Sequence, residues 1–166
     1  MNMALTPAEA RTIADAFLEA AKVVDKYLDD NFRKIRRAEY EFLNESCQTL
    51  WRVSTFATTV AVGLAIDALK NPATELKNVI EQTNKKIKAQ QTVGRVIRFV
   101  AGLADLAAGI MAKDPNAIVA SVTNLGNLIK RVSQSRSGLD AEFQALQGPP
   151  EARGNTPRRR RTRAVG

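Results

Sequence analysis

The side chains that could do chemistry in this sequence are mostly basic. The 166 residues include 25 Lys and Arg against 17 Asp and Glu, one Cys and no His, for a formal net charge of +8. The lack of His excludes a Ser-His-Asp triad, a Cys-His pair and any His-containing zinc or iron site. The single Cys47 excludes an intrachain disulfide, and its apolar surroundings predict a buried structural thiol. No cofactor site or metal site is predicted.

Two carboxylates, Asp67 and Asp105, lie beside or within long uncharged runs. A pair of carboxylates can act as general acid and base. The sequence, however, contains no nucleophile arrangement, metal-ligand set or phosphate-binding loop to accompany them. Because an isolated carboxylate is costly to bury, we expect both to be exposed or paired. The sequence therefore predicts a protein that is not an enzyme, with no catalytic residues and no small-molecule substrate.

Two groups of basic residues are candidates for binding anions. Residues 71–137 carry 10 basic and 4 acidic side chains, which suits phospholipid headgroups, nucleic acid or an acidic protein. A second group forms an arginine block near the C-terminus, where phosphate binding, a nuclear localisation patch and a solubilising end are the alternatives. The candidates are Lys85, Lys86, Lys88, Arg95 and Arg98 in the first group, and Arg158, Arg159, Arg160, Arg161 and Arg163 in the second.

Long windows almost without charge alternate with these basic groups. They cover residues 53–66, 99–112 and 115–129. As helices they would each be about 21 Å long, short of the ~30 Å hydrocarbon core of a bilayer. We expect them to pack together at the centre of a bundle; the alternative is that 53–66 and 96–112 insert into a membrane. The membrane or interface candidates are Trp51, Phe56, Val60, Leu64, Phe99, Leu103 and Ile110.

Capping and proline signals divide the chain into helices that would position these groups. Thr6 and Glu9 flank Pro7 in a capping-box pattern. The pairs Asn71-Pro72 and Asp114-Pro115 each end one helix and begin the next. Apolar residues at three- and four-residue steps predict helices over 7–70, 72–113 and 115–135, then a turn at 133–138 and a short helix over 139–147.

The first of these predicted helices is unusually long. Its apolar stripe runs through Ile13, Phe17, Ala20, Val24, Leu28, Phe32 and Ile35, then Phe42, Ser46, Leu50 and Val53. An unbroken helix over 7–70 would measure about 95 Å, more than a small globule can cover. It would require coiled-coil pairing or a rod, unless it breaks near 29–31, where cap-forming residues occur. Gly94 marks a candidate bend in the second helix.

These patterns predict an all-α fold, an up-and-down bundle of three long helices plus a short C-terminal helix, which the first helix could extend into an elongated shape. The bundle would form one domain over 1–147. Residues 148–166 combine three prolines with the arginine block, and we expect them to be a disordered basic tail.

Three functions follow as alternatives. The first is a non-enzymatic assembly or interaction protein that pairs with itself or a partner helix through its long N-terminal helix. The second is a membrane-active protein that inserts 53–66 and 96–112 and is attracted to anionic lipid. The third is a nucleic-acid-associated or packaging protein acting through the tail. With no secretory leader pattern and no full-length transmembrane span, a cytoplasmic location is expected, with peripheral membrane association as a variant.

Overall fold

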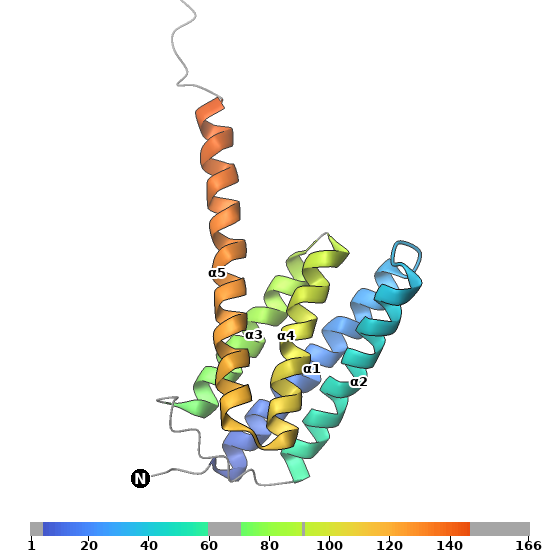
Figure 1. The fold of residues 1–166 in the computed structure, drawn as a ribbon, viewed down its shortest axis with the longest axis vertical. Coiled ribbons are helices and arrows are strands. Elements are labelled where there is room, and N and C mark those ends of the chain that lie inside the picture. Colours follow the sequence, from blue (N-terminus) through green and yellow to red (C-terminus); the bar gives the residue numbers. More distant parts are fainter. Residues whose placement is uncertain (1–4, 60–70, 91, 147–166) are drawn as a thin grey trace, which may run out of the picture. The chain divides into compact units, whose positions relative to one another are not determined.

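The computed structural model describes the backbone of residues 5–59, 71–90 and 92–146, and within these ranges the side chains except those of 57–59 and 136–146. Every regular element in this part of the chain is an α-helix, so the all-α prediction is confirmed. The order of elements is α1 (Pro7–Asn31), α2 (Arg37–Thr59), α3 (Pro72–Ala89), α4 (Val93–Ala112) and α5 (Pro115–Leu146) (Figure 1).

The start of α1 follows the predicted capping box. The Glu9 backbone N–H donates to the Thr6 hydroxyl (3.3 Å), and the Thr6 backbone N–H donates to the Glu9 carboxylate (2.7 Å). The bond from the Thr6 backbone, followed by that from its hydroxyl, holds the pKa of Glu9 below its usual range. Two donors that a helix end would otherwise leave unpaired are thereby satisfied.

An unbroken helix over 7–70 is wrong, and the alternative of a break near 29–31 is confirmed, because α1 ends at Asn31 and the chain turns before α2. Asn31 donates its side-chain amide to the Tyr27 carbonyl (3.0 Å), and the Lys34 N–H donates to the Asn31 carbonyl (2.8 Å). Glu39 then accepts a bond from the Arg36 backbone (2.9 Å) and starts α2. The two helices pack against each other, so the apolar residues of α1 and of α2 are buried against one another within one chain. The argument from length for pairing with another chain no longer applies.

The second predicted helix, over 72–113, also forms two helices, α3 and α4. Pro72 begins α3 as expected, although Asn71 makes no capping bond with its side chain. The helix ends at Ala89 because Gln90 adopts an extended conformation, with its N–H bonded to the Ile87 carbonyl. The interruption therefore precedes Gly94, which lies inside α4.

The start of α5 is confirmed at Pro115, and its end differs from the prediction. Asp114 accepts bonds from the backbone N–H groups of Asn116 (3.0 Å) and Ala117 (3.2 Å). Lys113, at φ 56°, takes the left-handed conformation that closes α4. The predicted turn at 133–138 is wrong, since α5 continues to Leu146. Serine and one glycine only weaken a helix, each by about 1 kcal/mol or less, and no proline stops this one.

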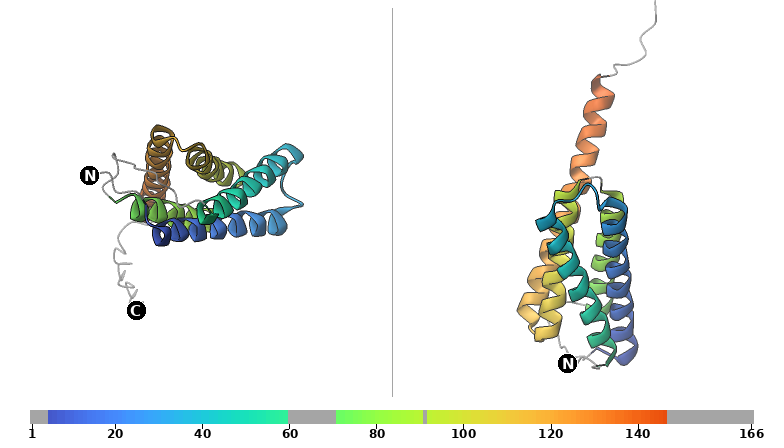
Figure 2. Two further views of the ribbon diagram at one scale, coloured as in Figure 1. Left: turned by 90° about the horizontal axis from the view of Figure 1, so that it is seen from below. Right: turned by 90° about the vertical axis from the view of Figure 1, so that its right-hand side faces the viewer.

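The first four helices form a ring. Helix α1 packs against α2 and α3, and α4 packs against the same two helices from the other side. Each helix runs opposite to the one before it in the chain, so the α1–α2 and α3–α4 turns lie at the same end, while the ring neighbours α1 and α3, and likewise α2 and α4, run in the same direction (Figures 1 and 2). The largest fully buried side chains are Phe17, Val24, Leu43, Leu50, Leu76, Ile80, Ile87, Phe99, Leu103, Leu106, Ile118 and Leu125.

Residues of α5 up to Val132 belong to the compact unit formed by Met1–Val132, and Ser133–Gly166 form a second unit. Leu125 and Ile118, on the first part of α5, complete the core of the first unit. The predicted tail over 148–166 lies outside the described residues.

Candidate interaction surfaces

The predicted basic group of residues 85–98 is divided between α3 and α4 and surrounds the turn that joins them. Lys85, Arg95 and Arg98 are exposed and form no ion pair with another described residue. Lys88 is exposed too, and its Nζ lies 3.4 Å from a carboxylate oxygen of Glu19 on α1. Lys86 is half-buried. The turn therefore gathers positive charge from both helices.

The α1–α2 turn, at the same end of the ring, presents an apolar side chain among charges. Phe32 is 65% exposed although its ring meets Tyr40 edge-on, with centroids 5.7 Å apart. Arg33 and Lys34 are exposed beside it. Sequence spacing had placed Phe32 on the buried stripe, and the break after Asn31 is what turns it outward.

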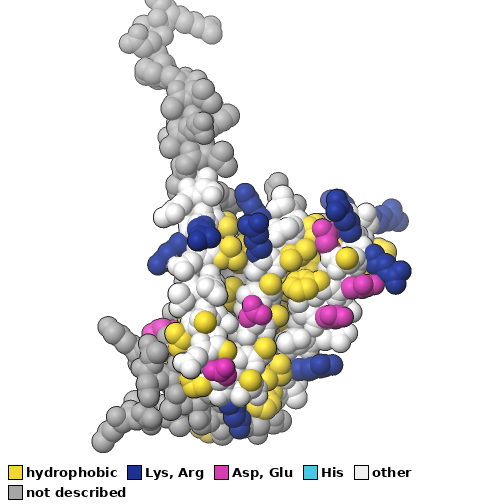
Figure 3. All heavy atoms as spheres, viewed as in Figure 1, with side chains coloured by type: hydrophobic (Ala, Val, Ile, Leu, Met, Phe, Trp, Pro, Cys, Tyr) yellow, Lys and Arg dark blue, Asp and Glu magenta, His cyan; other side chains and the backbone are white. Residues whose placement is uncertain are grey.

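Acidic neighbours compensate part of the positive charge at the α1–α2 turn. Arg37 pairs with Glu41 and Lys26 pairs with Asp30, each at 2.8 Å. We call the surface formed by both turns the basic end and define it by Phe32, Arg33, Lys34, Lys85, Lys88, Arg95 and Arg98. Figure 3 shows that, on the face it displays, most Lys and Arg side chains gather toward the end with these turns.

The candidates for membrane insertion lie in two environments. Phe99, Leu103 and Ile110 are at most 3% exposed and belong to the core. Phe56 is half-buried and Trp51 is 42% exposed. The other two candidates, Val60 and Leu64, lie outside the described residues. None of the described helices has both the length and the apolar character needed to cross a bilayer.

Cys47 is buried, as predicted, between α1 and α2. Its Sγ lies 3.3 Å from the carbonyl oxygen of Ala21, to which the thiol donates. Burial, with a further effect of the Asp25 charge, raises the pKa of the Cys47 thiol above its ordinary value. Because the thiolate is the reactive form, this cysteine is suited to packing rather than to chemistry.

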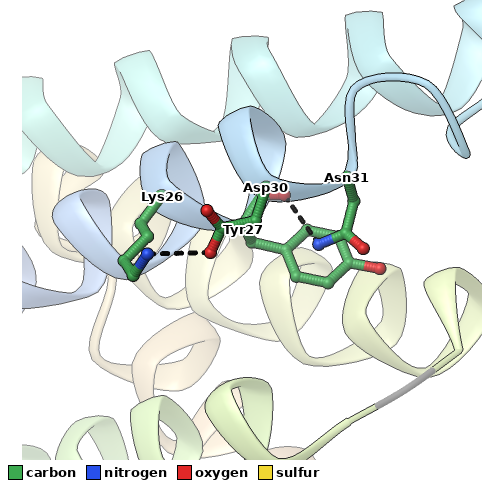
Figure 4. A network of polar contacts seen from close by, with 4 residues as sticks. All are labelled: Lys26, Tyr27, Asp30 and Asn31. Atoms are coloured by element: carbon green, nitrogen blue, oxygen red, sulfur yellow. Dashed lines mark hydrogen bonds and ion pairs between the residues drawn. The ribbon is translucent and has the colours of Figure 1, made fainter.

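A groove of about 460 Å³ lies between the C-terminal halves of α1 and α3. Figure 4 shows the polar groups on its α1 side, where Lys26 pairs with Asp30 and Asn31 bonds to the Tyr27 backbone. On the α3 side of the groove, Lys88 pairs with Glu19 of α1. Burial, and to a smaller extent the charge of Glu39, raises the pKa of the Tyr27 phenol. The charged groups of this groove are thus largely satisfied within the chain.

The remaining candidates do not assemble into a site. Asp105 is exposed on α4, as expected, whereas Asp67 and the arginines from Arg158 to Arg163 lie outside the described residues. Asn84 on α3 is only 4% exposed, and its side-chain oxygen has no hydrogen-bond partner among the described residues. The described residues contain no cluster of three or more Cys, Asp or Glu side chains that could hold a metal ion.

Comparison with known proteins gives no family: no family model, curated protein or solved structure matches this chain.

Proposed function

We propose that this chain is a non-enzymatic interaction protein that attaches through its basic end to an anionic lipid surface. The observation that supports the proposal most strongly concerns the basic end. Basic side chains without an acidic partner among the described residues, such as Arg95 and Arg98, lie at the same end of the ring as the exposed Phe32. From Gln82 to Ala104 the sequence contains no acidic residue, while it supplies five basic ones. Peripheral membrane proteins combine these two features, cations for anionic headgroups and an apolar side chain for the boundary below them.

The free energies that the basic residues and Phe32 can contribute to membrane binding favour reversible attachment rather than insertion. Each Lys or Arg near an anionic surface contributes about 1 kcal/mol, and this contribution is screened by salt. Full burial of Phe32 in the acyl boundary would add roughly 1.5–3 kcal/mol, which salt does not screen. Insertion of the core segment around Phe99 and Leu103 would instead require the ring to open, at the cost of its buried apolar contacts.

Vesicle flotation of the intact protein tests this proposal. We expect flotation with vesicles of phosphatidylcholine and phosphatidylserine at low salt, and none with phosphatidylcholine alone. Arg95→Glu should lower the bound fraction because it replaces attraction by repulsion. Phe32→Ala should lower it as well and should leave a bound state that salt removes more completely.

Two matched variants separate the basic end from general charge and hydrophobicity. Arg11→Glu makes the same charge change in the second turn of α1, at the other end of the ring, and Trp51→Ala removes a larger exposed aromatic side chain from the middle of α2. Neither should reduce flotation by as much as the variants at the basic end. Equal losses from Arg11→Glu and Arg95→Glu would contradict docking by this end, and binding that high salt leaves intact in Phe32→Ala would favour insertion.

Self-association is a second candidate, and the exposed aromatic residues of α2 favour it. Trp51 is 42% and Phe42 38% exposed, and large aromatic side chains are enriched at protein interfaces. We expect a dimer or larger species by light scattering at micromolar concentration, with Trp51→Ala shifting it toward the monomer. A monodisperse monomer would rule this candidate out. Nucleic-acid contact through Arg158–Arg163 stays a prediction, because those residues lie outside the described part of the chain.

A further inference from the structure

Two further grooves have volumes of about 390 Å³ each, at the lower end of the range for small-molecule sites. One lies between α4 and the first part of α5, and its lining includes Arg98, Gly102, Leu125 and Arg131. The other lies between α1 and α3, nearer their N-terminal ends than the groove described above. This last groove combines carboxylate side chains with a buried amide, and its lining includes Asp15, Ala16, Glu19, Lys77, Glu81 and Asn84.

The buried amide belongs to Asn84 of α3. Its side chain lines the groove although the residue is 4% exposed, and its Oδ1 has no hydrogen-bond partner among the described residues. A buried polar atom without a partner costs free energy, and most such atoms in folded proteins have one. A half-turn of the amide about the Cβ–Cγ bond exchanges Oδ1 and Nδ2, so the oxygen can face the groove. An unused acceptor therefore borders this groove.

Asp15 lies opposite Asn84 across the groove. Nζ of Lys88 on α3 lies 3.4 Å from Oε1 of Glu19 on α1, which fixes how the two helices are aligned. Asn84 precedes Lys88 by four residues and Asp15 precedes Glu19 by four residues, about one helical turn in each case. Because α1 and α3 run in the same direction (Figure 1), Asp15 and Asn84 face each other one turn closer to the N-terminal ends, and both line the groove.

Asp15 is also the carboxylate of this groove that lacks a partner among the described residues. Glu19 and Glu81 each pair with a lysine, at 3.4 and 3.8 Å. Asp15 is exposed and forms no hydrogen bond or ion pair with a described residue, not even with Arg11 one turn earlier on α1. One unpaired negative charge and one unused acceptor thus lie on opposite sides of the same groove.

We propose that this groove binds the primary ammonium group of a small aliphatic amine. Its N–H groups would donate to the Asp15 carboxylate and to Oδ1 of Asn84, and its positive charge would balance that of Asp15. An ammonium group has three donors and no acceptor, so it satisfies a carboxylate and an amide oxygen together. The site does not rest on attachment of the basic end to lipid.

Titration of the 15N-labelled full chain, followed at the asparagine side-chain amide signals, tests this site. The probes are ethylammonium chloride and tetramethylammonium chloride at equal ionic strength. Both cations carry one positive charge, but only ethylammonium can donate hydrogen bonds. We expect ethylammonium to shift the signals of Asn84 and not those of Asn31, whose amide is bonded to the Tyr27 carbonyl. Tetramethylammonium should bind at least about tenfold more weakly, because it makes no charge-assisted hydrogen bond.

Asp15→Asn should weaken ethylammonium binding about tenfold, the effect of losing one charge-assisted contact. Asp29→Asn is the matched control, because it makes the same charge change on α1 at a position outside the groove lining. It should leave ethylammonium binding unchanged. Both residues are exposed, so both variants should fold.

Asn84→Leu separates a ligand site from a mere packing defect. Leucine is similar in shape and has no polar atom to satisfy, so this variant should unfold at a higher urea concentration than the unmodified chain. A ligand that binds the folded state stabilises it. Ethylammonium should therefore raise the urea midpoint of the unmodified chain and leave that of Asn84→Leu unchanged.

Three results would overturn the site. The first is equal affinity for ethylammonium and tetramethylammonium, and the second is an equal loss of binding in Asp15→Asn and Asp29→Asn. The third is an undiminished effect of ethylammonium on the urea midpoint of Asn84→Leu. Since these measurements contain no lipid, their failure is independent of the flotation result.

Discussion

Phe17→Ala should lower the free energy of unfolding by about 3–5 kcal/mol, a large fraction of the roughly 5–15 kcal/mol by which small proteins are stable. The ring of Phe17 is 0% exposed on the face of α1 that meets the rest of the four-helix ring. The truncation removes its transfer free energy and leaves a cavity that rigid helices on several sides close only in part. Urea denaturation monitored by circular dichroism measures the effect.

Phe32→Ala is the matched control for this truncation. The same atoms are removed, but Phe32 is 65% exposed and its main described partner is the edge of Tyr40. The expected loss is at most about 0.5–1.5 kcal/mol, the range of one aromatic pair. Similar losses for the two variants would mean that α1 does not bury its stripe against the other helices as described.

Gly102→Val should destabilise the protein by about 1–3 kcal/mol through overpacking between α4 and α5. A Cβ at this position would lie 2.5 Å from Cδ2 and 3.0 Å from Cγ of Leu125. Leu125 is only 1% exposed, so its side chain has little room to move aside. The loss of stability is measured by urea denaturation, and the contact predicts a partial rescue when Leu125→Ala is added.

Gly126→Ala provides the opposite expectation on the neighbouring helix. No atom lies within 4 Å of the position that its Cβ would occupy. Replacing a helical glycine by alanine at such an open position should stabilise the protein by about 0.5–1 kcal/mol. A loss of stability in Gly126→Ala would contradict the described course of α5 at this residue.

The helix starts that could be predicted from the sequence are those with a local chemical signal. Pro7, Pro72 and Pro115 each begin a helix where expected, because proline fixes φ and needs no hydrogen-bond donor at that position. The interruptions at 32–36 and 90–92 contain no proline and no glycine. Apolar periodicity continues across them, so the pattern left the first break, near 29–31, as an alternative and predicted one helix over 72–113 where the chain forms two. Packing of α1 on α2, and of α3 on α4, decides between these possibilities.

The candidate surfaces, like the helix ends, could be predicted only where the signal is local in the sequence. The basic residues between Lys85 and Arg98 could be predicted as an anion-binding group, since no acidic residue interrupts them. The exposure of Phe32 could not, because it depends on where α1 ends. The groove containing Arg98 and Arg131 also escaped prediction. These residues are 33 positions apart in sequence, and only the close approach at Gly102 brings them to one groove.

Arg98 is common to the basic end and to the groove between α4 and α5. A protein attached to lipid through the basic end would therefore hold one end of this groove against the headgroups. Access to the groove and attachment to the membrane would then be coupled, and such coupling is reciprocal: whatever occupies the groove and weakens attachment is itself released by lipid to the same degree.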